Sequence, residues 1–230
     1  MLNSAIRGIA SMATRQLLAE LAEAYRQRSG VQVAFESVGG VDAARRVRSG
    51  EPFDVTVLAA DAIDRLVAAG HVLADSRVDL VRSGVAIAVH ADAARPDVAT
   101  ADALRRALLA ARSVGYSTGP SGVALLALLD RWGIGAALRD RLVQAPAGVP
   151  VGALVARGEV ELGFQQLSEL LHLPGIALLG PMPPGAEIVT TFSGGVCATS
   201  TRPAEVRALL DFMRSPAAAE AKRRHGMDPA

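Results

Sequence analysis

The chain of 230 residues contains a single cysteine, Cys197, so no disulfide can form within it. With no His or Asp beside it in a recognisable pattern, Cys197 is interpreted as a small strand residue, and the redox compartment stays open. Lysine is equally scarce: Lys222 is the only one, and Schiff-base chemistry on a central lysine is not expected. Aromatic residues make up 3% of the chain, and the net charge is +1. Lacking a basic stripe with interleaved aromatics, the sequence predicts no nucleic-acid partner.

Long hydrophobic runs are also missing. No stretch approaches the ~18 apolar residues that span a bilayer, and the first residues lack the charged start, apolar stretch and cleavage site of a secretory leader. The sequence therefore predicts a soluble chain, cytoplasmic as given and periplasmic if an export leader has been removed. His71 and His90 are not spaced like metal ligands and have no Cys or acidic cluster nearby. No metal and no cofactor are expected.

What the chain does contain is an alternation of apolar runs and amphipathic helical patterns, in a sequence that is 50% hydrophobic. This alternation predicts an α/β fold of βαβ units with mixed, mostly parallel sheets. The elements predicted in the first part are strand 5–10, helix 13–28, strand 31–37, helix 41–49, strand 55–59 and helix 61–69. An apolar run over 80–91 is predicted to pass from one lobe to another.

The same alternation continues in the second part of the chain. The elements predicted there are helix 101–111, strand 113–117, helix 121–132, short helix 135–140, strand 142–145, helix 149–157, strand 162–165, a helical turn at 168–171 and strand 176–179. Residues 180–185 hold three prolines and two glycines and are predicted to form a stiff loop. Two extended pieces at 187–191 and 194–198, helix 203–214 and a tail over 217–224 are expected to follow.

Three apolar runs break into Ser, Thr and Gly immediately before a helical pattern. The breaks contain Ser11 and Met12, then Ser37 with Gly39 and Gly40, and finally the segment 116–122. Each break leaves hydroxyls and unpaired N–H groups at the positive end of a helix dipole, which suits an anion. Ordinary helix capping is the alternative for each serine. Three breaks from both halves of the chain favour a cleft that holds a small anion.

Several segments, in this order and spacing, resemble a known family. They are SVGG at 37–40, GEPFDV at 50–55, YSTGPSG at 116–122, VARGEVELGF at 155–164 and LDFMRSP at 210–216. Together they resemble the type II periplasmic solute-binding proteins, in particular the molybdate-binding branch, over nearly the whole chain. The resemblance implies two Rossmann-like α/β lobes joined by two crossover strands. Lobe one would be 1–82 plus 192–230 and lobe two 83–191, with the ligand cleft between them.

The resemblance places Ser11 and Ser37 at the anion loops of lobe one and 116–122 at the anion loop of lobe two. With these loops, the polar residues after strand 162–165 and those near the return crossing, the candidate ligand contacts are Ser11, Met12, Ser37, Gly39, Gly40, Ser117, Thr118, Ser121, Gly122, Gln165, Gln166 and Ser193. Gln165 marks a departure, because molybdate binders usually carry a Tyr at the comparable strand end. The amides of Gln165 and Gln166 and the hydroxyl of Ser168 suit carboxylate oxygens at least as well as an oxometallate. The alternative is that they are ordinary polar residues of the protein surface. Arginines could help to neutralise a multiply charged ligand, and the candidates are Arg15, Arg45, Arg46 and Arg82.

An enzymatic offshoot of this family, the aconitate isomerases, resembles the chain around 11–14 and 37–44. It implies a 1,3-proton shift next to carboxylates, which needs oxyanion donors and a base. Glu169 is the favoured base for its place beside Gln165 and Gln166. The other candidate bases are Asp61, Glu36, Asp42 and His172. The rivals are a molybdate-like oxyanion receptor of an ABC transporter, a cytoplasmic anion sensor, and a binding module for another ligand. The family suggests a monomer.

Overall fold

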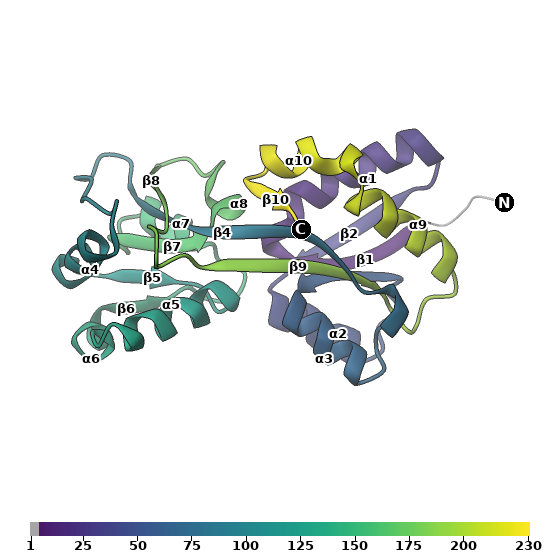
Figure 1. Cartoon of the computed structure of the whole chain (residues 1–230), viewed down its shortest axis with the longest axis horizontal. Coiled ribbons are helices and arrows are strands. Elements are labelled where there is room, and N and C mark those ends of the chain that lie inside the picture. The colour runs from purple at the N-terminus through teal and green to yellow at the C-terminus, as the bar shows by residue number, and fades with distance from the viewer. Residues whose placement is uncertain (1–4) are drawn as a thin grey trace. The chain divides into compact units, whose positions relative to one another are not determined.

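The fold is described from a computed structural model, which describes residues 5–230; the predicted features of residues 1–4 lie outside this range. The chain divides into two compact units, drawn in Figure 1. Unit 1 comprises Met1–Arg82 and Thr191–Ala230, and unit 2 comprises Ser83–Thr190. The chain leaves unit 1 within β4 (Val78–His90) and returns within β9 (Val189–Val196). Each unit is an α/β structure with a mixed sheet, which confirms the predicted fold class.

The sheet of unit 1 is mostly parallel. β1 (Ile6–Ser11) lies between β2 (Val33–Val38) and β3 (Val55–Ala59) and is parallel to both. β9 is antiparallel to β3 and lies on its other side. A short strand near the end of the chain, β10 (Met227–Pro229), pairs with β4 and was not predicted from the sequence.

Helices cover both faces of the unit 1 sheet. Alternate strand residues point to opposite faces, and apolar residues on each face pack against the helices that cover it. Ile6 and Ala10 pack into one core, whereas Ile9 packs into another. The first core is closed by α1 (Arg15–Ser29), α9 (Pro203–Arg214) and α10 (Ala219–Arg224). The second is closed by α2 (Gly40–Arg48) and α3 (Ala60–Ala68). Figure 1 shows these two groups of helices on opposite sides of the strands.

The sheet of unit 2 has the strand order β8, β4, β7, β5, β6. β5 (Val114–Tyr116) is parallel to β6 (Leu142–Gln144) and β7 (Leu162–Gln166), and β4 is antiparallel to β7 and β8 (Ile176–Pro181). One face is covered by α4 (Ala101–Ala110), α5 (Pro120–Arg131) and α6 (Gly135–Leu138). The other is covered by α7 (Val151–Ala156) and α8 (Leu167–Leu170). Short 3-10 turns complete the chain at Met12–Thr14 (η1), Ala74–Ser76 (η2), Arg139–Arg141 (η3) and Pro216–Ala218 (η4).

The predicted break between 187–191 and 194–198 is wrong, since β9 is one continuous strand. Its two glycines serve close packing. A Cβ on Gly194 would lie 2.6 Å from Leu210 Cδ2, and one on Gly195 would lie 2.5 Å from Val72 Cγ1. The stiff loop predicted from residue 180 also begins later, because Gly180 and Pro181 belong to β8.

Cys197 follows β9 and is buried, with 2% of its surface exposed. Burial, together with the charge of Asp54, raises the pKa of its thiol to about 12. Because the thiolate is the reactive form, we expect no reaction of the native protein with a thiol reagent at pH 8. One equivalent should react after denaturation, and a spectrophotometric thiol assay measures both. Rapid labelling of the native protein would contradict the interpretation of Cys197 as a packing residue.

Among the described residues, no helix combines the length and the apolarity needed to cross a membrane.

Candidate functional site

The carboxyl ends of β1 and β2 bring two of the predicted turns together in unit 1. The strands are parallel, and their register places Ala10 opposite Ser37 and Ser11 opposite Val38. The Ser11 hydroxyl oxygen lies 4.0 Å from the position that a Cβ on Gly40 would occupy. The two turns therefore share one edge of the sheet.

Two helices begin at this edge without a side-chain cap. Gly39 is the N-cap of α2 and Ala59 is the N-cap of α3, and neither side chain can accept a hydrogen bond. A Cβ on Gly39 would meet no atom within 4 Å, so open space borders the start of α2. Because the first N–H groups of a helix have no partner within it and lie at the positive end of its dipole, this edge suits an anion.

The hydroxyls at this edge differ in how they are engaged. Ser11 is the N-cap of η1, and its oxygen accepts a hydrogen bond from the N–H of Ala13 at 3.4 Å. Met12 is half-buried at the start of that turn. Ser37 is also half-buried, and its hydroxyl makes no hydrogen bond with any described residue. It is the hydroxyl of this edge with the greatest freedom to meet a ligand.

Ser193 lies on β9 of the same unit, opposite Leu58 of β3. It is fully buried and donates its hydroxyl proton to Asp79 Oδ1 at 2.6 Å. Asp79 Oδ1 also lies 3.0 Å from a guanidinium nitrogen of Arg77. The Ser193 proton is therefore committed to Asp79, although its oxygen can still accept a hydrogen bond.

The third predicted turn follows β5 in unit 2 and is tightly closed. The hydroxyl oxygens of Ser117 and Ser121 lie 3.0 Å apart, and the N–H of Gly119 donates to Ser117 Oγ at 3.2 Å. A Cβ on Gly122 would lie 1.9 Å from the backbone oxygen of Ser117, so only glycine fits there. Thr118 is exposed at the tip of the turn. α5 begins directly after it, with Gly119 as an N-cap that offers no side chain.

The carboxyl end of β7 lies beside this turn in the sheet, since β5 and β7 are parallel neighbours. Gln165, with 3% of its surface exposed, uses both ends of its side-chain amide there. Its Oε1 accepts the N–H of Val151 at 2.7 Å and that of Gly152 at 3.4 Å. Its Nε2 donates to Glu169 Oε1 at 2.8 Å. The Gln165 amide, which was predicted to contact a ligand, is thus held between the start of α7 and Glu169 of α8.

The Glu169 carboxyl has a strongly altered acidity. Burial raises its pKa to about 7, although the hydrogen bond from Gln165 acts in the opposite direction. The residue is still partly exposed, so it combines a desolvated carboxyl with access from outside. A carboxyl of this acidity can both accept and return a proton near neutral pH.

Two polar residues near Gln166, Thr190 and Ser83, were not predicted from the sequence. Gln166 Nε2 donates to Thr190 Oγ1 at 2.8 Å, while its Oε1 is buried with no partner in residues 5–230. Ser83 is fully buried, and its hydroxyl also lacks a partner among the described residues. Val85 pairs with Gln166, and Ser83 points to the same face two residues earlier. The signal was the Ser-Gly interruption at 83–84 in the apolar run 80–91.

The other candidate bases are exposed or paired. Asp61 forms an ion pair with Arg65, and Asp42 forms one with Arg45. Hydrogen bonding from Arg46 lowers the pKa of Glu36, which makes it a weaker base. His172 is exposed.

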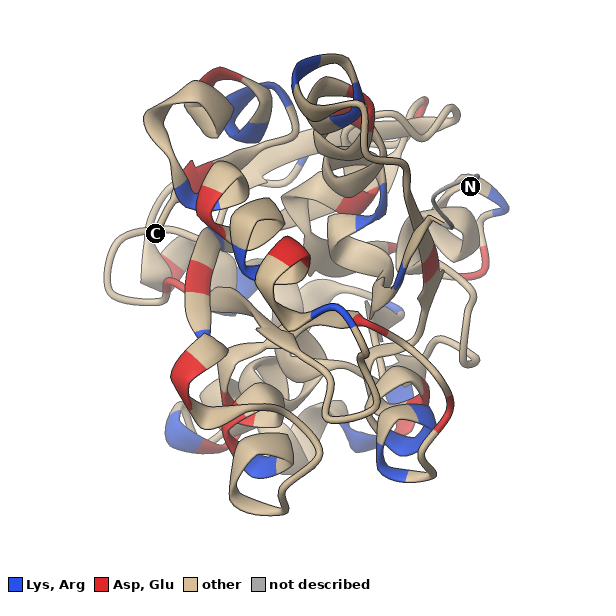
Figure 2. Ribbon diagram, turned by 90° about the vertical axis from the view of Figure 1, so that its right-hand side faces the viewer, with Lys and Arg blue, Asp and Glu red and all other residues tan. Residues whose placement is uncertain are grey.

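Two of the four candidate arginines form ion pairs within the protein: Arg45 pairs with Asp42, and Arg46 pairs with Glu36 and Glu51. The other two, Arg15 and Arg82, are exposed. Figure 2 shows acidic and basic segments interspersed along the ribbon.

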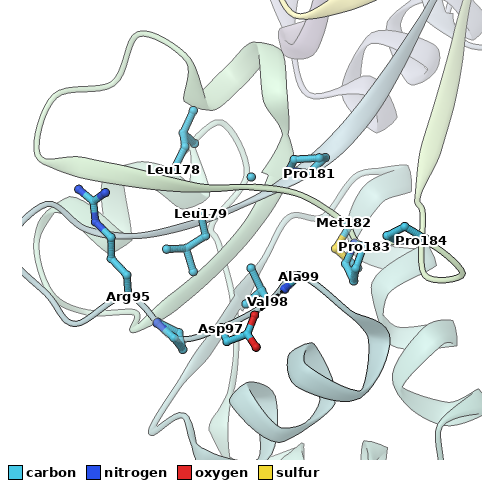
Figure 3. A pocket seen from close by; sticks show the side chains of 12 residues that line it. Arg95, Asp97, Val98, Ala99, Leu178, Leu179, Pro181, Met182, Pro183 and Pro184 are labelled. Atoms are coloured by element: carbon cyan, nitrogen blue, oxygen red, sulfur yellow. Dashed lines mark hydrogen bonds between the residues drawn. The ribbon is translucent and has the colours of Figure 1, made fainter.

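The described residues contain no metal cluster, and one of their cavities is not lined by any candidate ligand-binding residue. No group of three or more His, Cys, Asp or Glu within residues 5–230 could hold a metal ion. A cavity of about 410 Å³ lies in unit 2 between β8 and the loop 95–99. Figure 3 shows Leu178 and Leu179 on the strand and Arg95 and Asp97 on the loop. None of the predicted ligand-binding residues lines it.

The comparisons with known proteins agree with the fold. The sequence profile of a family described as bacterial extracellular solute-binding proteins matches residues 6–228. The chain belongs to this family. Solute-binding proteins of known structure share the fold: the periplasmic molybdate-binding protein of Azotobacter vinelandii gives a TM-score of 0.80 at 19% identity, over 96% of this chain and 98% of that one. The sulfate-binding protein of Mycobacterium tuberculosis gives 0.79 at 19% identity, over 99% and 87%.

The chain is also similar to an enzyme. It is 42% identical over 216 residues to an aconitate isomerase of a Pseudomonas species, which corresponds to 91% of this chain and 82% of that protein. The family membership and the enzymatic resemblance predicted from the sequence are both confirmed.

Proposed function

We propose that this solute-binding family member is an isomerase that acts on a small polycarboxylate such as aconitate by a 1,3-allylic proton shift. The observation that carries the proposal is the Glu169 carboxyl, which burial brings to a pKa of about 7 at the end of β7. The 42% identity with an aconitate isomerase over most of both chains supports the same reaction.

The reaction needs one proton carrier and no redox partner. A base removes a proton from the CH₂ carbon next to the double bond, and the electron pair moves into the conjugated carboxylate system. The double bond forms one position along, and the proton is returned to the far vinylic carbon. The substrate neither gains nor loses atoms or electrons. A single carboxyl with a pKa near 7 can perform both transfers, and we assign this role to Glu169.

The charge that develops between the two transfers must be stabilised by donors. Neutral donors occur at both predicted sets: Ser11, Ser37 and the start of α2 in unit 1, and Ser117, Thr118 and the start of α5 in unit 2. Hydroxyls and helix N-termini that are already oriented stabilise developing negative charge without reorganisation. Each set suits a carboxylate, with Met12, Gly39 and Gly40 shaping the turns of unit 1 and Ser121 and Gly122 shaping the turn of unit 2.

A second candidate function is an oxyanion receptor without catalysis. It is favoured by the fold shared with molybdate- and sulfate-binding proteins and by the serine-rich turns at two helix N-termini. A tetrahedral oxyanion would use the same hydroxyls and N–H groups. A receptor without catalysis would not require the raised pKa of Glu169, so we place this function second.

Calorimetry and NMR separate the two functions. The protein is titrated with molybdate, tungstate, sulfate, citrate and aconitate. Cis- and trans-aconitate are then incubated with it in D₂O, and the loss of the CH₂ proton signal and the appearance of the other isomer are followed. We expect citrate and aconitate to bind and both isomers to interconvert. Tight binding of molybdate with neither binding nor exchange of aconitate would refute the isomerase and establish the receptor.

Replacing Ser37 by Ala is expected to weaken citrate binding about tenfold. The reason is that a hydrogen bond to a charged group contributes about 1.5 kcal/mol, and this hydroxyl has no competing partner among the described residues. The affinity is measured by calorimetry. Ser49→Ala is the matched control, because Ser49 is exposed at the opposite end of α2 and donates to the backbone oxygen of Arg46. Equal affinities for the two variants would remove Ser37 from the site.

The compartment and the oligomeric state have their own tests. The family description names extracellular proteins. Comparing the amount of the protein in periplasmic and cytoplasmic extracts decides which compartment holds it. We propose a monomer, which sedimentation equilibrium tests.

A further inference from the structure

The side chain of Gln165 is fixed in one orientation by the start of a helix. α7 follows Pro150, so the N–H groups of Val151 and Gly152 have no partner within the helix. Both point to Gln165 Oε1, at 2.7 and 3.4 Å. Because N–H groups donate only to the oxygen of a side-chain amide, the Nε2 end of Gln165 must face the other way. That end meets Glu169 Oε1 at 2.8 Å.

Among the described residues, the elements that surround Glu169 carry few other titratable side chains. β7, α7 and α8 hold no titratable side chain besides Glu169 itself. Leu170 packs against β4 and β8. β8 is uncharged, whereas β4 carries Asp79, Arg82 and His90, all outside the stretch Val85–Ala88 that pairs with β7. Arg157 ends α7, and His172 lies beyond α8. Burial and Gln165 are the two causes of the shift in the pKa of Glu169.

We infer that Gln165 is a positioning residue, which acts on the reaction through Glu169 and not through contact with the ligand. The α7 N-terminus fixes the Gln165 amide, and the amide in turn holds Glu169 Oε1 in place. The other carboxyl oxygen, Oε2, is then the one that exchanges a proton with the substrate. This inference rests on the proposed function, in which Glu169 is the proton carrier. It also explains why an amide stands at 165: a single side chain must accept at one end and donate at the other.

Two substitutions at 165 separate donation to Glu169 from the capping of α7. Gln165→Glu keeps an oxygen for the N–H groups of Val151 and Gly152, but when ionised it cannot donate and places a second negative charge beside Glu169. Gln165→Met removes both functions. A bond to the ionised carboxyl lowers its pKa, so losing the bond raises it. We expect the midpoint of the Glu169 titration to move upward by about one pH unit or more in both variants.

The titration is measured by carbon-13 NMR on ligand-free protein with labelled glutamate, with Glu169 assigned by its absence in Glu169→Gln. The second readout is the acid limb of the pH dependence of kcat/KM for aconitate, which reports the free enzyme and should move upward by the same amount. Gln144→Met is the control, because Gln144 is exposed on β6 of the same unit; it should leave both readouts unchanged. A purely structural role of Gln165 would lower stability without moving either midpoint.

The outcomes separate this inference from the proposed function. If the Glu169 midpoint stays in place in Gln165→Glu, which keeps the cap of α7, the positioning role is wrong, whatever the activity. A midpoint that moves while the pH profile does not would also overturn it. If the midpoint moves and the wild-type protein does not isomerise aconitate, the contact is supported and the proposed function fails.

Discussion

Glu169→Gln is expected to lower the isomerisation of aconitate about 10³-fold while leaving citrate binding little changed. A positioned acid–base group contributes about 10²–10⁴-fold to proton transfer, and an amide cannot accept the substrate proton. The change is nearly isosteric and removes a charge that burial disfavours, so the fold should be retained. The measurement is the exchange of the CH₂ proton in D₂O, followed by NMR at pH 7.5, with calorimetry for the affinity.

The matched control is Glu187→Gln, since Glu187 is exposed in the same unit and its carboxylate accepts the N–H of Gly185. This control should keep the full rate. In the wild-type protein the rate should rise with pH through about 7, because the base must be ionised and its pKa has been raised to that value. Unimpaired exchange in Glu169→Gln would transfer the role to Asp61, Asp42, Glu36 or His172.

Gly122→Ala is expected to destabilise the protein by about 3 kcal/mol and to abolish citrate binding. The added Cβ would lie 1.9 Å from the backbone oxygen of Ser117 and 3.0 Å from the Tyr116 ring. A backbone oxygen cannot rotate away as a side chain can, so the turn before α5 must move and its donors must leave their positions. Thermal unfolding followed by circular dichroism and calorimetric titration measure the two effects.

Gly119→Ala is the control from the same turn. Its Cβ would lie 3.6 Å from Ser117 Oγ, an ordinary contact, and its φ of −85° suits alanine. This variant should be close to wild type in stability and affinity. If Gly122→Ala behaved like Gly119→Ala, the turn would be less rigid than its geometry requires.

Much of the fold could be predicted because its elements are marked by local patterns. Helix 203–214 and strand 55–59 were predicted with the bounds that the structure has. The first begins at a proline, and the second is an apolar run between polar segments. β10 and the continuity of β9 could not be predicted in this way. β10 depends on pairing with β4, and Gly194 and Gly195 depend on Leu210 and Val72 from other parts of the chain.

The candidate site divides along the same line. Ser11, Ser37 and Ser117 could be placed at strand ends from the sequence, since a strand that breaks before a helix exposes its last residues at one sheet edge. The partners of Gln165 and Ser193 could not be placed. Gln165 Oε1 bonds to residues 13 and 14 positions away, and Ser193 bonds to Asp79 across 114 positions.

The sequence by itself determined that this protein is an α/β solute-binding family member with serine- and glycine-rich turns before its helices, because hydrophobic periodicity and turn chemistry act over a few residues. Only the tertiary structure decided which polar side chains remain available. It engages Gln165 and the Ser193 proton within the protein, leaves the hydroxyl of Ser37 without a described partner, and desolvates Glu169. Hydrogen-bond partners and burial are set by neighbours in space, and acidity follows from both.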